Sequence, residues 1–126
     1  MRITLLCTVI LNLAGVNFAQ AATSKLDCSF NMVCSPTHGC KSETFSLQYI
    51  FDGNANTAII VGNSGTSQVE YHAGFEGISF VEKLFSGAIM TTTIANNGDA
   101  VHSRHTMISG LVPSQYFGEC QVEDSQ

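Results

Sequence analysis

The chain has 126 residues, with 5 Lys and Arg against 10 Asp and Glu and a formal net charge of −5. This length suits one domain with a modest core and leaves no room for a second. Nucleic-acid binding and attraction to an anionic membrane both depend on clustered Lys and Arg. The composition therefore disfavours both, and we expect no nucleic-acid partner.

Residues 1–21 have the three parts of a secretory signal peptide. Arg2 supplies the positive charge, an apolar run follows over residues 3–16, and Ala19-Gln20-Ala21 is a small-x-small cleavage site. The apolar run is shorter than the roughly 20 residues of a spanning helix. We therefore expect no membrane anchor and a periplasmic or secreted domain of residues 22–126, which holds four basic and ten acidic residues.

The cysteine count depends on that cleavage. Of five cysteines, Cys7 leaves with the signal peptide, and Cys28, Cys34, Cys40 and Cys120 remain. An even number in an exported chain predicts two disulfides, although three connectivities are possible.

We expect Cys28 to pair with Cys120, which would tie the two ends of the domain together, and Cys34 to pair with Cys40. The second pair would close a short loop rich in turn formers. Zinc binding, with His38 as a further ligand, is the alternative. The spacing between the cysteines is longer than in a zinc knuckle, so we expect no metal.

Beyond Lys41 the sequence reads as short β-prone runs separated by Gly and Asn clusters, which predicts about seven antiparallel strands. The most regular run, residues 44–51, alternates so that Phe45, Leu47 and Tyr49 share one face. A loop is expected at Gly110 to Ser114. The other strands are expected at residues 57–61, 68–73, 78–84, 88–95, 100–108 and 115–122.

The strongest hairpin joins residues 88–95 to residues 100–108. Its Asn97-Gly98 pair is typical of a two-residue type I′ turn, which would place Thr92 opposite Ser103. On this register Val101, Ser103 and His105 point inward, and His102 and Arg104 point outward.

Consecutive hairpins of this kind must bury one apolar face. They can do so by closing into a barrel or by folding into two packed sheets. We expect an all-β antiparallel meander that forms a small, disulfide-stapled barrel, with a β-sandwich as the alternative, and a monomer.

The candidate site residues gather near the second strand of that hairpin. His105 and Ser103 on one face suggest nucleophilic catalysis, with Glu82 as a third member, but the chain lacks a nucleophile-elbow motif. Arg104 could bind a carboxylate or a phosphate, and Tyr116 could line a cavity. A hydrogen-bonded polar patch inside the core is the competing interpretation.

The closing segment carries a resemblance. Ser103-Arg104-His105-Thr106, followed by Val112-Pro113-Ser114-Gln115-Tyr116-Phe117-Gly118-Glu119-Cys120, resembles the C-terminal hairpin of small exported proteins of unknown function from alphaproteobacteria. The resemblance implies a periplasmic, disulfide-bonded β protein and assigns no activity. In architecture alone the chain is also similar to small periplasmic β-barrel lysozyme inhibitors.

We therefore expect a non-enzymatic binding module without a cofactor, which contacts a protein partner or a small apolar ligand inside the barrel. A small hydrolase-like enzyme that uses His105, Ser103 and Glu82 is the second hypothesis. A structural envelope protein is the third. A cavity on the inward face of the 88–108 hairpin would favour the first.

Overall fold

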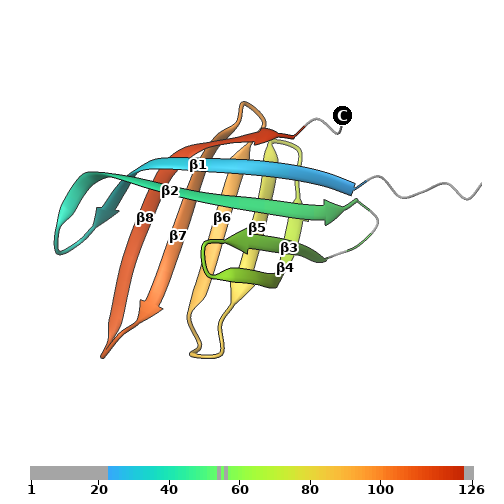
Figure 1. The fold of residues 1–126 in the computed structure, drawn as a ribbon. Helices are drawn as coiled ribbons and strands as arrows, with labels where there is room; N and C mark the ends of the chain where they lie inside the picture. The colour runs from blue at the N-terminus through green and yellow to red at the C-terminus, as the bar shows by residue number, and fades with distance from the viewer. Residues whose placement is uncertain (1–22, 54, 56, 124–126) are drawn as a thin grey trace, which may run out of the picture.

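The computed structural model describes residues 23–53, 55 and 57–123. The predicted signal peptide, with Cys7, lies outside these residues. Eight antiparallel strands follow one another in chain order and close into a barrel (Figure 1). They are β1 (Thr23–Ser35), β2 (Gly39–Asp52), β3 (Thr57–Gly62), β4 (Gly65–Ala73), β5 (Gly77–Lys83), β6 (Ile89–Ala95), β7 (Asp99–Met107) and β8 (Leu111–Val122).

The predicted disulfide-stapled, all-β meander is confirmed, and it closes into the expected barrel rather than the alternative β-sandwich. In the part of the chain described, no helix is long and apolar enough to span a bilayer. The additional strand is β1, where an irregularity between Phe30 and Met32 interrupts the alternation. Val33 rather than Met32 is buried as a result, and such a bulge hides a strand from a strict period-two pattern.

Pairing of β1 with β8 closes the barrel, and Cys28 lies directly opposite Cys120 in this pair. These two cysteines form one disulfide, and Cys34 and Cys40 form the other across the β1–β2 turn. Both predicted pairings are confirmed. The first disulfide therefore fixes the seam of the barrel, across 92 positions of sequence.

The predicted loop at Gly110 to Ser114 is wrong, because β8 begins at Leu111 and Pro113 pairs with His105 of β7. Proline lacks an N–H and is tolerated where one side of a strand is unpaired. The pairing of β8 with β1 reaches only Gln115. Pro113 therefore lies where no second neighbour needs its N–H.

The turn between β6 and β7 also differs from the prediction. Three residues, Asn96, Asn97 and Gly98, form the connection, and the Gly98 N–H donates to the Ala95 carbonyl at 2.9 Å. Only Gly98 of these has positive φ, at 95°. This is a type I turn followed by a left-handed residue rather than a type I′ turn.

The side chain of Asn97 favours this turn, because its Oδ1 accepts from the Asp99 N–H at 3.0 Å. One additional turn residue shifts the register by one position, so Thr92 lies opposite His102 instead of Ser103. The predicted inward placement of Ser103 and His105 is therefore wrong. His102 and Arg104 face the interior instead.

Two groups of rings fill the interior. Tyr49 and Phe80 stack at 4.0 Å between centroids, with Phe51 and Tyr71 packed around them. The second group surrounds His102. It consists of Phe30, Phe45, His102 and Tyr116.

Candidate functional site

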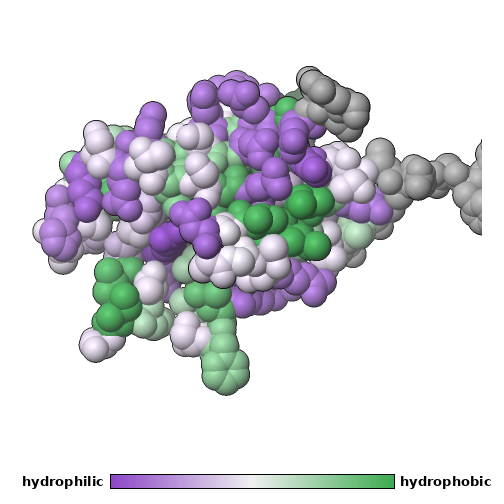
Figure 2. All heavy atoms as spheres, in the orientation of Figure 1, coloured by the Kyte–Doolittle hydropathy of each residue, from purple (hydrophilic) through white to green (hydrophobic). Residues whose placement is uncertain are grey.

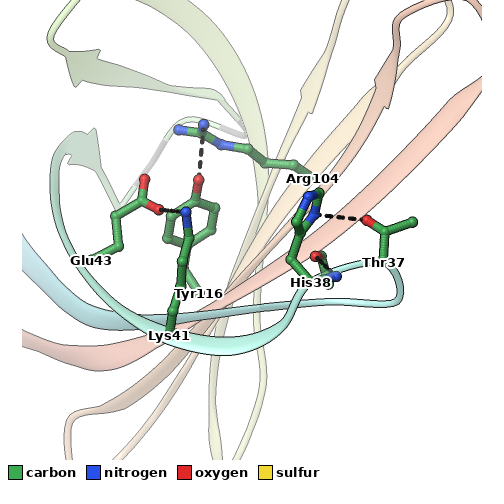
Figure 3. Close-up of polar contacts among 7 residues, drawn as sticks. Thr37, His38, Lys41, Glu43, Arg104 and Tyr116 are labelled. Carbon is green, nitrogen blue, oxygen red and sulfur yellow. Dashed lines mark hydrogen bonds and ion pairs between the residues drawn. The ribbon is translucent and has the colours of Figure 1, made fainter.

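Arg104 of β7 lies at the centre of the candidate site. Its guanidinium carbon is 4.3 Å from the centroid of the Phe45 ring and 4.8 Å from that of the Tyr116 ring. Nη1 donates to the Tyr116 hydroxyl at 3.5 Å, a contact visible in Figure 3. Two aromatic rings from β2 and β8 therefore hold the cation in one place by contacts with their electron-rich faces.

A chain of hydrogen bonds runs from Arg104 into the core. Arg104 Nε donates to His102 Nε2 at 3.3 Å, and His102 Nδ1 lies 2.7 Å from Thr92 Oγ1. Thr92 Oγ1 is also hydrogen-bonded to the Tyr49 hydroxyl. These bonds link β7, β6 and β2 across the interior.

His102 is neutral in this chain. Burial, together with the neighbouring Arg104 charge, lowers the pKa of His102 to about 4. Because Nε2 accepts from Arg104, the ring proton belongs on Nδ1 and donates to Thr92. The Thr92 hydroxyl is then free to donate to Tyr49.

Tyr49 is neutral as well. Burial raises the pKa of Tyr49 to about 12, with the hydrogen bond from Thr92 opposing and the Glu82 charge adding to the increase. Among the described residues, no buried side-chain nitrogen or oxygen is left without a hydrogen-bond partner. The polar groups inside the barrel are thus satisfied, and Arg104 is the charged end of their chain.

A cavity of about 590 Å³ lies over Arg104 at one mouth of the barrel. It is bounded by β2, by the β3–β4 turn, and by β5 to β8, and it contains both apolar and polar side chains. Glu82 and Glu43 are its acidic members. Glu43 is paired with Lys41 at 3.7 Å, beside Arg104 in the view of Figure 3.

Arg104 retains hydrogen-bonding capacity toward this cavity. Its guanidinium has more N–H donors than the two used for His102 and Tyr116. None of the described carboxylates lies within ion-pair distance of it. The forked donors of an arginine match the two oxygens of a carboxylate or phosphate.

A larger depression, about 690 Å³, lies elsewhere on the barrel. Its charged lining consists of Asp27, Glu119 and Glu123, and it contains no basic side chain. Gln48 donates to Asp27 at 2.7 Å and to Glu123 at 3.3 Å. Asp27 and Glu123 are thus bonded to the Gln48 amide, and Glu123 also pairs with Lys25 at 3.9 Å. Because the lining itself holds no basic side chain, the Arg104 cavity is the better candidate site for an anion.

The structure brings together only part of the predicted site. Arg104, Glu82 and Tyr116 line the same cavity. Ser103 faces the other side of β7, where its hydroxyl accepts from Gln115 Nε2 at 3.3 Å. His105 is exposed, at a small depression beside the Cys34–Cys40 disulfide. The hypothetical His105, Ser103 and Glu82 triad does not converge.

Sequence reasoning missed His102 as a site residue because the predicted hairpin register was one position out. The alternation of residues 44–51 did place Phe45 and Tyr49 inward. Recognising a three-residue turn at Asn96-Asn97-Gly98 would have given the correct register and placed His102 on the inward face. No set of three or more described His, Cys, Asp or Glu side chains is arranged to hold a metal ion.

Comparison with protein families, curated proteins and solved structures finds no match to this chain. The resemblance of the closing segment to exported alphaproteobacterial proteins therefore stays a prediction. Any assignment of function depends on the geometry of the barrel mouth.

Proposed function

We propose that this protein is a binding module that holds a small organic anion in the barrel mouth, with its carboxylate or phosphate group on Arg104. The observation that carries the proposal is the placement of Arg104. It lies over the neighbouring rings of Phe45 and Tyr116, whose centroids are 5.0 Å apart, and it faces a cavity of about 590 Å³ without a carboxylate partner.

Preorganisation supports this function. An arginine in solution loses side-chain entropy when it binds an anion. Here the two rings and the His102 acceptor already restrict the guanidinium. His102 is neutral near pH 7, so it neither repels Arg104 nor competes for the anion.

The remaining lining defines the rest of the ligand. Leu47, Ile60, Leu84 and Met90 offer apolar surface, and Glu82 can accept a hydrogen bond from a ligand O–H or N–H. The small apolar ligand expected from the sequence thus becomes an amphipathic one. Its body is apolar and one end is anionic.

The compartment we propose is the periplasm or the extracellular space. Two disulfides are typical of proteins that fold under oxidising conditions. Binding there requires no cofactor, and the barrel acts as a monomer.

The first prediction concerns the anion. Titration with hexanoate, followed by ¹H–¹⁵N NMR, should perturb the Arg104 Nε resonance and its neighbours, whereas the neutral analogue 1-hexanol should bind more weakly. Arg104→Gln should lower the affinity for hexanoate by about tenfold or more, since a hydrogen bond to a charged group contributes roughly 1.5 to 3 kcal/mol.

Lys41→Gln is the matched control, because it removes an exposed positive charge that is paired with Glu43. It should leave the affinity for hexanoate within about twofold of wild type, since an exposed ion pair contributes little. Equal affinities of wild type and Arg104→Gln for hexanoate, or no binding of hexanoate to wild type, would contradict the proposal.

A further inference from the structure

Two hairpin tips extend from the same end of the barrel and carry exposed apolar side chains. The first is the β5–β6 tip, residues 84–89, and the second is the β7–β8 tip, residues 107–112. Figure 2 shows both as hydrophobic projections at the lower edge of the molecule. Their exposed large apolar residues are Phe85, Ile89, Met107, Ile108, Leu111 and Val112.

The two tips share a sequence pattern. Leu84-Phe85-Ser86-Gly87 and Met107-Ile108-Ser109-Gly110 each place two large apolar residues before Ser-Gly at the turn. Neither tip contains an Asp, Glu, Lys or Arg. Because β6 and β7 pair along the sheet, the two hairpins are neighbours. Exposed apolar clusters of this kind mark interaction surfaces.

We propose that these two tips insert into the surface of a lipid bilayer with zwitterionic headgroups. The side chain of Phe85 has a relative exposure of 110%, so no groove or shelf of the protein surrounds it. A protein partner would need a separate socket for each projecting tip. The fluid apolar region of a bilayer accommodates both without a matching shape.

The backbone of the tips is suited to such an environment, where an unpaired N–H or C=O is costly. In the first tip Leu84 N–H donates to the Ala88 carbonyl at 2.9 Å and Gly87 N–H to the Leu84 carbonyl at 3.0 Å. In the second, Ile108 N–H donates to the Gly110 carbonyl at 2.9 Å. Several turn groups are therefore paired within the tips themselves.

Charge identifies the kind of lipid. Lys83, at the base of the first tip, is paired with Glu70 at 2.7 Å, and Arg104 lies inside the barrel mouth. The basic residues near this end therefore present little free positive charge, and the protein is acidic as a whole. An anionic surface would repel it, whereas a zwitterionic surface would not.

The tips also lie beside the proposed ligand cavity. Leu84 belongs to the first tip and lines that cavity together with Arg104. An amphipathic anion leaving a bilayer would reach Arg104 from this end. Insertion of the tips does not depend on ligand binding, and the two can be tested separately.

The second prediction is partition to vesicles. In flotation assays the protein should bind phosphatidylcholine vesicles, and Phe85→Ser or Ile108→Ser should each lower the partition coefficient by about tenfold, since each removes a large apolar side chain from contact with lipid. Replacing a third of the lipid with phosphatidylglycerol should not increase binding. All variants keep the same N-terminal residues, so any contribution from residues 1–21 cancels.

Val122→Ser is the matched control, because Val122 is 66% exposed, as Ile108 is, and lies near the other end of the barrel. It should leave partition unchanged. Failure of wild type to float, an equal loss in Val122→Ser, or stronger binding with phosphatidylglycerol would overturn the proposal. A lipid-free dimer that Phe85→Ser dissociates in sedimentation experiments would overturn it in favour of a second copy of this chain.

Arg104→Gln should still float with the vesicles, and Phe85→Ser should still respond to hexanoate. If wild type binds hexanoate but not vesicles, or vesicles but not hexanoate, the missing property identifies which proposal has failed.

Discussion

His102 shows how one side chain can connect the core to the site. Its ring is 1% exposed and contacts the rings of Phe45 and Tyr116 that hold Arg104. Protonating it would place a second positive charge beside the guanidinium and would remove the acceptor for Arg104 Nε. The low pKa of His102 therefore preserves both the core and the geometry of the proposed anion site.

The third prediction follows from this pKa, which is about 4 in the folded protein and near 6.5 when unfolded. Between these values the unfolded chain binds more protons, so stability falls as the pH falls through this range. The free energy of unfolding from urea titrations should decrease by roughly 3 kcal/mol from pH 7 to pH 4 on account of this residue.

His102→Gln should flatten that part of the pH profile, whereas His105→Gln, at an exposed position, should not. An unchanged slope in His102→Gln would show that other groups cause the acid sensitivity.

The sequence predicted His105 rather than His102 as the inward histidine. Which histidine faces inward depends on the β6–β7 turn. A type I′ turn would require positive φ at Asn97, but Asn97 does not have it, and its side chain instead accepts from the Asp99 N–H in a type I turn.

At the level of elements, the close approach of β8 to β1 depends on Gly118. A Cβ built on Gly118 would lie 2.0 Å from the Ser29 carbonyl oxygen and 2.6 Å from the Phe30 Cα. Both are backbone atoms that cannot move aside alone. The absence of a side chain therefore allows the two strands of the seam to pack at this position.

The fourth prediction is that Gly118→Ala lowers the free energy of unfolding by about 3 kcal/mol or more, since it overpacks two paired strands. Chemical denaturation would measure the loss. Gly53→Ala is the control, because no atom lies within 4 Å of its added Cβ, and it should change stability little. Similar values for the two variants would show that β8 can shift to accommodate a methyl group.

Element boundaries were the least predictable part of the fold. The runs that became β2 to β7 were recognised because β-prone residues are separated by Gly and Asn clusters, and residues 44–51 also because apolar and polar side chains alternate. β1 was not predicted because its bulge and its cysteines obscure the strand pattern. The start of β8 was predicted as a loop because it contains Pro113. In both cases the pairing partner, rather than the local sequence, decides that the segment is a strand.

At the scale of the whole molecule, closure was predictable and the site only in part. Consecutive short hairpins with one apolar face predicted a barrel or a β-sandwich, and the expected export predicted two disulfides, for which one of three possible connectivities was preferred. Arg104, Tyr116 and Glu82 were among the predicted site residues and line one cavity, although Arg104 was placed on the wrong face. A cavity depends on how all eight strands curve together, which no local pattern records.

The fifth prediction compares the two disulfides. Replacing Cys28 and Cys120 with Ala removes a link across 92 positions and should cost about 4 to 5 kcal/mol, whereas replacing Cys34 and Cys40, separated by 6 positions, should cost about 2 kcal/mol. Urea titrations of both double variants would test the order. Equal losses, or a larger loss for the short loop, would contradict it.

The seam disulfide also has a consequence for biogenesis. If the chain is exported N-terminus first, as proposed above, it presents Cys28, Cys34 and Cys40 together, before Cys120 has emerged. Until then, Cys28 has only the wrong partners available, and a premature bond to either would block the pairing of β1 with β8. The short Cys34–Cys40 link, if formed first, removes both competitors and leaves Cys28 to wait for the last strand.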